Sequence, residues 1–291
     1  MDWTMDDLKT LRNATGAGVM ACRRALETTR GNIEASKALI AEWGLNEVEK
    51  RASRETNEGY VALVSVPGKA AMVALACETD FVARNSLFID VAESIARSVL
   101  ISGHIRLSRE AEALISDLGM RMKEKVAVSG LAYLEAKNGQ ILEAYRHGGG
   151  RIAAAASAEI VSEKPVSVAG ESAARAMLHE LCLQITAKAP LFLRKEEIPP
   201  ADMEGAQKRF AEEVAGDEKL KGKPAAILER ALAGKLGRFV RESCLLSQAY
   251  IKDESVDVGS WLEAEARKAG FELNPTAFIR LEIAQERSRL K

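Results

Sequence analysis

The sequence has no surplus of positive charge, no paired cysteines and no long apolar run. Its 41 Lys and Arg residues nearly balance its 42 Asp and Glu residues, which gives a formal net charge of -1. The strong cationic field of a nucleic-acid-binding protein is therefore missing, although the net charge does not exclude a local basic patch. The four cysteines stand singly without a C-x-x-C pair, as is typical of buried thiols in a reducing compartment. A signal peptide and an apolar run of about 18 residues are also missing, so we expect a cytoplasmic location.

The motifs of common catalytic and metal sites are missing as well. Neither a Walker-type glycine loop nor a G-x-S-x-G nucleophile turn occurs. His104, His147 and His179 lie far apart and lack the i, i+4 spacing of a helical metal pair. Residues 148–151, G-G-G-R, lack the strand-turn-helix spacing of a dinucleotide site, so we interpret them as a tight connection between strands. We expect no catalytic residue, cofactor or metal in this chain, and a triad that assembles only in three dimensions remains an alternative.

Hydrophobic residues make up 47% of the 291 residues, which is enough for one large core or two to three smaller ones. In residues 1–45, apolar spacing predicts three short helices, with Thr4 capping the first and Asn32 capping the third, which ends before Gly44. The highly charged residues 46–59 predict a solvated helix or linker and a domain boundary. We therefore expect a separate helical head.

From Tyr60 the pattern changes to short apolar runs and helices. A β-hairpin is predicted around the turn Pro67-Gly68-Lys69 and another around Asn138-Gly139, each followed by helical spacing. This repeated order predicts two related subdomains, residues 60–139 and residues 140–291. Residues 199–243 predict a helical hairpin inserted into the second subdomain. The expected fold class is α+β, with a three-helix head followed by two related subdomains that contain antiparallel strands.

The stretch C-E-T-D-F-V-A-R-N, residues 77–85, lies between a predicted strand and a predicted helix. In one interpretation, Asp80 caps the helix and Phe81 folds back onto it as a hydrophobic staple. In the other, Phe81 projects outward as an aromatic anchor for a pocket on another protein, beside the Asp80 carboxylate. The local pattern does not choose between them.

Three stretches together resemble the elongation factor Ts (EF-Ts) family: L-R-N-A-T-G-A-G-V-M-A-C-R-R-A-L in the head, C-E-T-D-F-V-A-R-N, and A-Y-R-H-G-G-G-R-I-A. The resemblance continues in the family's order over nearly the whole chain. It implies that the head is a ubiquitin-associated-like (UBA-like) bundle. It also implies a guanine-nucleotide exchange factor for elongation factor Tu (EF-Tu) in bacterial translation elongation. Such a factor binds EF-Tu·GDP, displaces Mg²⁺ and promotes GDP release so that GTP can bind, and it is not an enzyme. The alternative is a translation-associated scaffold that binds EF-Tu without exchange.

The resemblance implies two sets of site residues. The residues that would dislocate Mg²⁺ from EF-Tu are Thr79, Asp80, Phe81 and Val82, with Phe81 as the wedge. The residues that would bind the partner are Thr15, Gly16, Ala17, Gly18 and His147. The alternatives are a tight turn that the glycines permit and a strand-end histidine bonded locally. The implied partner is EF-Tu, both GDP-bound and nucleotide-free, and no direct contact with nucleic acid or membrane is expected. A homodimer or a 2:2 complex with EF-Tu is an alternative to a single copy.

Two positions depart from the family's pattern. Relatives often read D-C-K-K-A-L in the second helix, where this chain has A-C-R-R-A-L from Ala21 onward, so head docking is expected to be tuned differently. Where relatives often read I-G-E, this chain has Met122, Lys123 and Glu124, so we do not transfer that contact.

Overall fold

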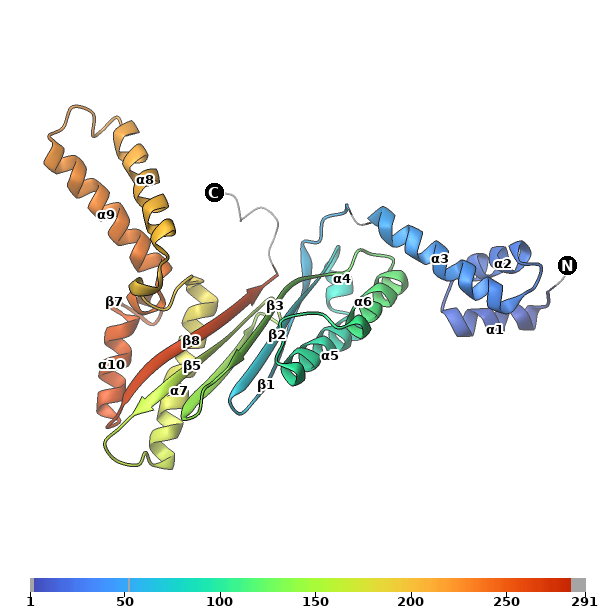
Figure 1. Cartoon of the computed structure of the whole chain (residues 1–291), viewed down its shortest axis with the longest axis horizontal. Helices are drawn as coiled ribbons and strands as arrows, with labels where there is room; N and C mark the ends of the chain where they lie inside the picture. The colour runs from blue at the N-terminus through green and yellow to red at the C-terminus, as the bar shows by residue number, and fades with distance from the viewer. Residues whose placement is uncertain (1–2, 52, 284–291) are drawn as a thin grey trace. The chain divides into compact units, whose positions relative to one another are not determined.

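The computed structural model describes residues 3–51 and 53–283. They form an α+β protein with three helices at its N-terminus, followed by antiparallel strands and further helices (Figure 1). The first of two compact units holds the described residues of 1–62 and 73–131 with Glu282 and Ile283; the second holds residues 63–72 and 132–281. Among the described helices, none has the length and apolarity needed to cross a membrane. The domain limits drawn from the sequence stay a prediction.

The head consists of α1 (Met5–Thr15), α2 (Val19–Thr28) and α3 (Ile33–Arg51). Thr4 caps α1 as predicted, because its hydroxyl accepts from the Asp7 amide while the Asp7 carboxylate accepts from the Thr4 amide. The head has a small core of buried residues: Leu8, Leu11, Cys22, Ala25 and Leu26. The predicted end of the third helix before Gly44 is wrong. The Glu- and Lys-rich residues that follow Gly44 are good helix formers, and α3 continues to Arg51.

The next part of the chain contains β1 (Glu58–Val66), β2 (Lys69–Cys77), α4 (Asp80–Ala83), α5 (Ser86–Ser102), α6 (Arg109–Met122) and β3 (Ala127–Glu135). The strands form a sheet in the order β1-β2-β3, which confirms the first predicted hairpin. Every residue of β2 from Ala70 to Cys77 is buried. Helix α5 lies where helical spacing was predicted after the first hairpin, and it buries Phe88, Val91, Ala92, Ile95, Ala96 and Val99. Gly103 caps its end with a φ of 68°, which suits glycine. These elements fix the two ends of the segment 77–85.

The remaining elements are β4 (Gln140–His147), β5 (Ile152–Val161), α7 (Val168–Lys188), η1 (Lys195–Glu197), α8 (Pro200–Gly216), α9 (Ala225–Ser243), η2 (Leu245–Ser247), β6 (Ala249–Tyr250), β7 (Asp253–Asp257), α10 (Val258–Lys268) and β8 (Glu272–Glu282). A second sheet has the order β4-β5-β8, and β6 pairs with β7. The hairpin predicted across Asn138-Gly139 is wrong in its pairing. Strand β3 neighbours β2 and strand β4 neighbours β5, so this turn leads the chain from one sheet into the next.

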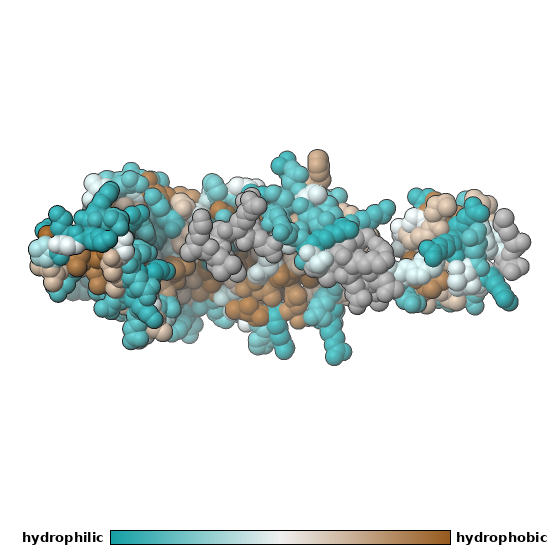
Figure 2. All heavy atoms as spheres, turned by 90° about the horizontal axis from the view of Figure 1, so that it is seen from above, coloured by the Kyte–Doolittle hydropathy of each residue, from teal (hydrophilic) through white to brown (hydrophobic). Residues whose placement is uncertain are grey.

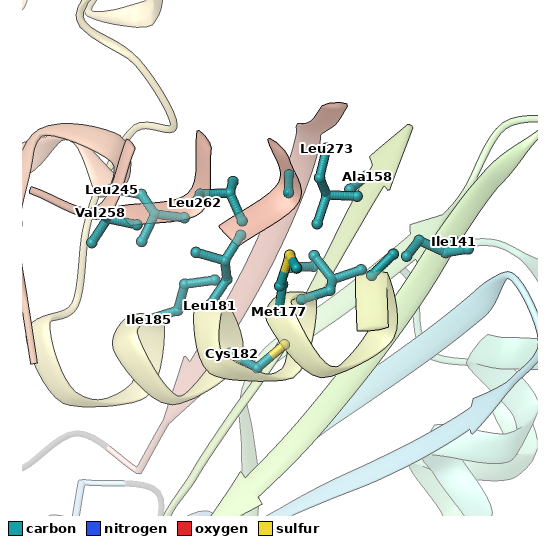
Figure 3. Packing of buried hydrophobic residues seen from close by; sticks show 14 of the residues in the cluster. Ile141, Ala158, Met177, Leu181, Cys182, Ile185, Leu245, Val258, Leu262 and Leu273 are labelled. Atoms are coloured by element: carbon teal, nitrogen blue, oxygen red, sulfur yellow. The ribbon is translucent and has the colours of Figure 1, made fainter. Parts of the chain in front are cut away.

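The core of the second unit forms around α7. Figure 3 shows Met177, Leu181 and Ile185 of this helix among residues from the later elements, including Leu245 and Leu262. Gln184 is also buried, and its side-chain nitrogen donates to Gln248 Oε1 and to the Ala249 carbonyl oxygen, both at 3.1 Å. The buried amide is therefore hydrogen-bonded, as a buried polar group must be.

Helices α8 and α9 form the predicted helical hairpin (Figure 1). The rings of Phe210 and Phe239 meet edge to face with centroids 6.3 Å apart, and Lys235 Nζ lies 2.8 Å from Glu213 Oε2. An aromatic pair and an ion pair thus link the two arms. On the face seen in Figure 2, hydrophilic residues predominate among smaller apolar patches, in line with a charged fraction of 29%.

Candidate functional site

The segment 77–85 forms a compact turn between β2 and α5 (Figure 1). Thr79 has extended backbone angles and caps the four-residue helix α4, since its hydroxyl accepts from the Val82 amide. Asn85 then caps α5 by accepting from the Leu87 amide at 2.9 Å. Two successive caps therefore determine the course of the backbone on both sides of Phe81.

Phe81 is 84% exposed, whereas its neighbours Val82 and Ala83 are buried, with exposed fractions of 8% and 7%. The staple interpretation is therefore wrong in both of its parts. Thr79, not Asp80, supplies the cap, and Phe81 does not fold back onto the helix. Val82 and Ala83 occupy the inward positions of this single helical turn, so the residue before them points into solvent.

A carboxylate from elsewhere in the chain holds the base of this turn. Glu124 Oε2 accepts from the backbone amides of Glu78 and Thr79, both at 3.1 Å, and Glu124 Oε1 accepts from the Thr79 hydroxyl at 2.6 Å. Glu124 follows Lys123, which ends α6 with a left-handed φ of 58°. The hydroxyl bond has the short length of a hydrogen bond to a charged acceptor, and the three bonds together fasten Glu78 and the cap residue Thr79 in place.

A reciprocal set of contacts surrounds Glu78. Its Oε1 accepts from the Lys125 amide at 2.6 Å, and Arg54 Nη1 lies 3.2 Å from both of its carboxylate oxygens. Lys125 Nζ in turn donates to the Arg54 carbonyl oxygen at 2.7 Å. The segments around residues 54, 78 and 124 are thereby joined in one polar network beneath the turn.

The thiol of Cys77 completes the support of the turn from its buried side. Cys77 Sγ donates to the Thr79 carbonyl oxygen at 3.2 Å. Burial, followed by the negative charge of Glu124, raises the pKa of Cys77 to about 12. The group therefore stays a thiol and a donor at neutral pH, and it is one of four free, buried cysteines, as the sequence predicts.

Asp80 lies beside Phe81 on the exposed side. Its Oδ2 is 3.2 Å from Arg84 Nη2, and the two side chains are 46% and 82% exposed. An ion pair so open to solvent contributes little to stability. The Asp80 carboxylate can therefore exchange Arg84 for another charged group at small cost.

The predicted head contact forms the connection between α1 and α2. Gly16, with φ of 65°, ends α1, and Gly18 precedes α2 with no side chain to cap it. Thr15 donates to the Leu11 carbonyl oxygen at 2.7 Å and accepts from the Ala17 amide. The expected tight turn is confirmed, and Gly16 and Gly18 leave its backbone exposed.

A groove of about 530 Å³ lies on α2 beside this turn. Its lining residues are Met20, Ala21, Arg23, Arg24, Glu27 and Trp43. Met20 is 72% exposed, and the Arg24 guanidinium lies 4.9 Å from the centre of the Trp43 ring. The departure at Ala21 therefore falls on a surface that borders the predicted contact.

His147 ends β4 opposite Ile152, and residues 148–151 turn the chain into β5 as expected. Its side chain is exposed, and its Nδ1 lies 2.9 Å from the Tyr145 hydroxyl. The Tyr145 ring also meets His179 edge to face, with centroids 5.4 Å apart. A local bond thus orients the imidazole without burying it.

The structure brings Thr79, Asp80, Phe81 and Val82 together on one turn, whereas the head loop joins α1 to α2 and His147 ends β4. The sequence did not single out Arg54, Glu124 or Lys125 as functional residues. The one signal in the sequence that could have pointed to Glu124 is its match to the third letter of the I-G-E pattern. Within the described residues, no group of three His, Cys, Asp or Glu side chains can hold a metal.

A cleft of about 820 Å³ in the second unit contains none of the predicted site residues. Its lining mixes Arg194 and Arg267 with Glu263 and the apolar Leu262 and Phe271. The Arg194 guanidinium donates to the Pro275 carbonyl oxygen at 2.9 Å. Opposite charges and apolar groups here define no single ligand chemistry.

Comparison with known proteins identifies the family. The family model described as Elongation factor TS matches residues 78–285. The chain is 36% identical over 270 residues to Elongation factor Ts of Hydrogenobaculum sp. (strain Y04AAS1), covering 89% of this chain and 93% of that protein. It is 33% identical over 299 residues to that of Aquifex aeolicus (strain VF5), covering 96% and 97%. It is also 31% identical over 289 residues to that of Acholeplasma laidlawii (strain PG-8A), covering 96% and 91%. With a fold of the expected class and these matches over nearly its full length, the chain belongs to the elongation factor Ts family.

Proposed function

We propose that this protein is the guanine-nucleotide exchange factor of elongation factor Tu. The observation that carries the proposal is a phenylalanine, Phe81, held 84% exposed on a turn whose backbone is capped and clamped. An exposed aromatic ring on a rigid support is the form that an interface anchor takes before its pocket is present. The family match supports the translational role, and EF-Tu is the partner that the family implies.

In the proposed mechanism, Phe81 enters EF-Tu beside the nucleotide and dislocates the Mg²⁺ held there. Bound guanine nucleotide depends on its phosphate contacts and on this ion, which is the largest counter-charge in such a site. Asp80, whose ion pair with Arg84 is exposed, places a negative charge next to the wedge. Thr79 and Val82 hold the wedge from below, one through its cap and the other through burial.

The protein acts by binding, without covalent chemistry of its own. It needs only to bind EF-Tu more tightly when the nucleotide is absent than when it is present. By linkage, nucleotide weakens the binding of the factor by the same ratio, so incoming GTP releases it. A differential affinity of about 5.5 kcal/mol moves a site from almost full to almost empty.

Two further surfaces are proposed to hold the partner. The turn formed by Thr15, Gly16, Ala17 and Gly18 exposes backbone on the head, and the neighbouring Met20 adds an apolar side chain. His147 presents an exposed imidazole that Tyr145 orients. We assign both surfaces to EF-Tu binding, while Phe81 acts on the nucleotide site.

The test is release of fluorescent GDP from EF-Tu with Phe81→Ala. We expect the exchange rate to fall roughly 10- to 30-fold, as for an interface hot spot. Stability should change by less than about 0.5 kcal/mol, because an exposed side chain contributes little to its own core. Ile101→Ala is the matched control, since Ile101 is 87% exposed and lies at the end of α5.

Normal exchange by folded Phe81→Ala would refute the wedge. The scaffold alternative, in which the protein binds EF-Tu without exchange, predicts that GDP release is no faster with the factor than without it. The parent protein in the same assay separates these two functions.

A further inference from the structure

We propose that Glu124 is the positioning residue of the exchange step: it holds Thr79, and through Thr79 it fixes the direction in which Phe81 projects. The inference rests on the proposed function of Phe81 and adds a residue from a different part of the chain. Glu124 lies 45 positions after Thr79, yet its two carboxylate oxygens accept three hydrogen bonds from Glu78 and Thr79.

Helix α4 needs such a support because it has four residues. One helical turn does not form by itself, since nucleating a helix costs more than its first hydrogen bond returns. Its first amides also lack partners within the helix. The Thr79 hydroxyl accepts from the Val82 amide and donates to Glu124, so the same hydroxyl caps α4 and joins it to the clamp.

The clamp is itself held in position. Glu124 stands directly before Lys125, whose amide donates to Glu78 Oε1 at 2.6 Å. Glu124 therefore accepts from the amides of Glu78 and Thr79, and Glu78 accepts from the amide of Lys125, the residue after Glu124. Arg54 Nη1 lies 3.2 Å from both carboxylate oxygens of Glu78 and so restrains this carboxylate as well.

A clamp of this kind acts on the exchange step more than on docking. Phe81 is 84% exposed, so the direction of its side chain follows mainly from the backbone of α4. Without Glu124 the turn would have to order during insertion, and the interface would lose the advantage of a preformed anchor. The maximal exchange rate at saturating factor should fall, while the concentration for half saturation should change less.

The experiment compares Glu124→Ala, Glu124→Gln and the control Asp117→Ala in the full chain. Asp117 is an acid on α6 whose ion pair with Arg121 is exposed, so its loss should leave exchange unchanged. We expect Glu124→Ala to lower the maximal rate at least about tenfold, the ratio that 1.4 kcal/mol of lost positioning gives. Glu124→Gln should stay within roughly threefold of the parent, because an amide oxygen can accept from both backbone amides while its NH₂ donates to Thr79.

The double variant Glu124→Ala/Phe81→Ala separates positioning from a general loss of stability. If Glu124 acts through Phe81, the double variant should exchange at the same rate as Phe81→Ala alone. Additive losses would contradict this. Amide hydrogen exchange gives a direct check, since the Glu78 and Thr79 amides should lose protection in Glu124→Ala and keep it in Glu124→Gln.

Each failure has its own meaning. If the parent protein does not accelerate GDP release, the proposed function fails; if it does but Phe81→Ala exchanges normally, the wedge role of Phe81 fails. If Phe81→Ala is impaired and Glu124→Ala matches the parent, the positioning role alone fails. Should Glu124→Ala not fold, Thr79→Val decides: it keeps the shape of Thr79 but removes the 2.6 Å bond, and a parent-like maximal rate would overturn the inference.

Discussion

The single turn of helix α4 has one side in solvent and one side in the core. Val82 and Ala83 are buried beneath the turn, while the Phe81 ring stays in water. Burying a phenylalanine side chain is worth about 1.5–3 kcal/mol, so the free protein forgoes this stabilisation. If a pocket on the partner buries the ring, this free energy of burial contributes to the affinity of the complex.

Lys123 shows a second local cost, at the end of α6. It adopts φ of 58°, a left-handed conformation that costs a residue with a Cβ atom roughly 1–2 kcal/mol and suits glycine. We predict that Lys123→Gly raises the free energy of unfolding by about 1 kcal/mol, measured by urea denaturation.

The control for this position is Lys123→Ala, which keeps the Cβ atom and should bring no comparable gain. A Lys123→Gly protein no more stable than Lys123→Ala would show that this backbone conformation is not strained. The two variants also test the effect of the departure from the I-G-E pattern, because both leave Glu124 in place.

Local signals predicted most elements but not all of the pairing between them. Periodic apolar residues predicted a helix after each of the two turns and the helical hairpin, and the structure has α5, α7, α8 and α9 there, since helices depend on neighbours within a few positions. The Asn138-Gly139 turn was expected to join a hairpin, yet β3 and β4 neighbour different strands. Strand pairing depends on contacts across the whole fold, which a short turn sequence does not contain.

The candidate site was predictable to a similar extent. The family resemblance implied Thr79, Asp80, Phe81 and Val82 as site residues, whereas the local pattern left two directions for Phe81. The clamp could not be inferred from spacing, because three helices, α4, α5 and α6, separate Thr79 from Glu124 in the chain. A hydrogen bond across 45 positions leaves no periodic trace in a sequence.

The hairpin of α8 and α9 is predicted to be dispensable for the fold of the second unit. Its aromatic pair and the Lys235–Glu213 ion pair join one arm to the other. Replacing residues 208–236 by a short Gly-Ser turn should lower helicity in circular dichroism. It should shift the melting midpoint by less than about 4 °C, the effect of roughly 1 kcal/mol in a unit of this size.

A contrasting variant tests the root of the hairpin. Gln248 Nε2 donates to the Glu242 and Lys188 carbonyl oxygens, so Gln248→Leu should destabilise the protein by about 1–3 kcal/mol. If removing the outer hairpin proves as damaging as Gln248→Leu, the arms support more of the fold than their mutual contacts indicate.

For the molecule as a whole, the head is proposed to bind EF-Tu and Phe81 to act on the nucleotide site. The head should therefore contribute to affinity but not to the maximal exchange rate. Because α3 continues to Arg51, the deletion should remove residues 1–52, so that the shortened chain starts at Ser53. The truncated protein should bind EF-Tu roughly tenfold more weakly or worse, measured by calorimetry, and should keep its folded core.

An unchanged dissociation constant would count against a docking role for residues 1–45. Exchange at saturating concentration should survive truncation, since Phe81 and its clamp lie outside the deleted segment. Sedimentation of the same samples with EF-Tu tests whether a homodimer or a 2:2 complex forms, a prediction that the sequence leaves open.

The network around Arg54 has a consequence for the order of binding events. Arg54 follows the head helix closely in the chain, and Glu78 and Lys125 hold it at the base of the turn that carries Phe81. The covalent tether from the head therefore ends at a fixed point next to the wedge. In the proposed mechanism, docking of the head makes the insertion of Phe81 an intramolecular event with a high effective concentration, so a weak second contact can still act quickly.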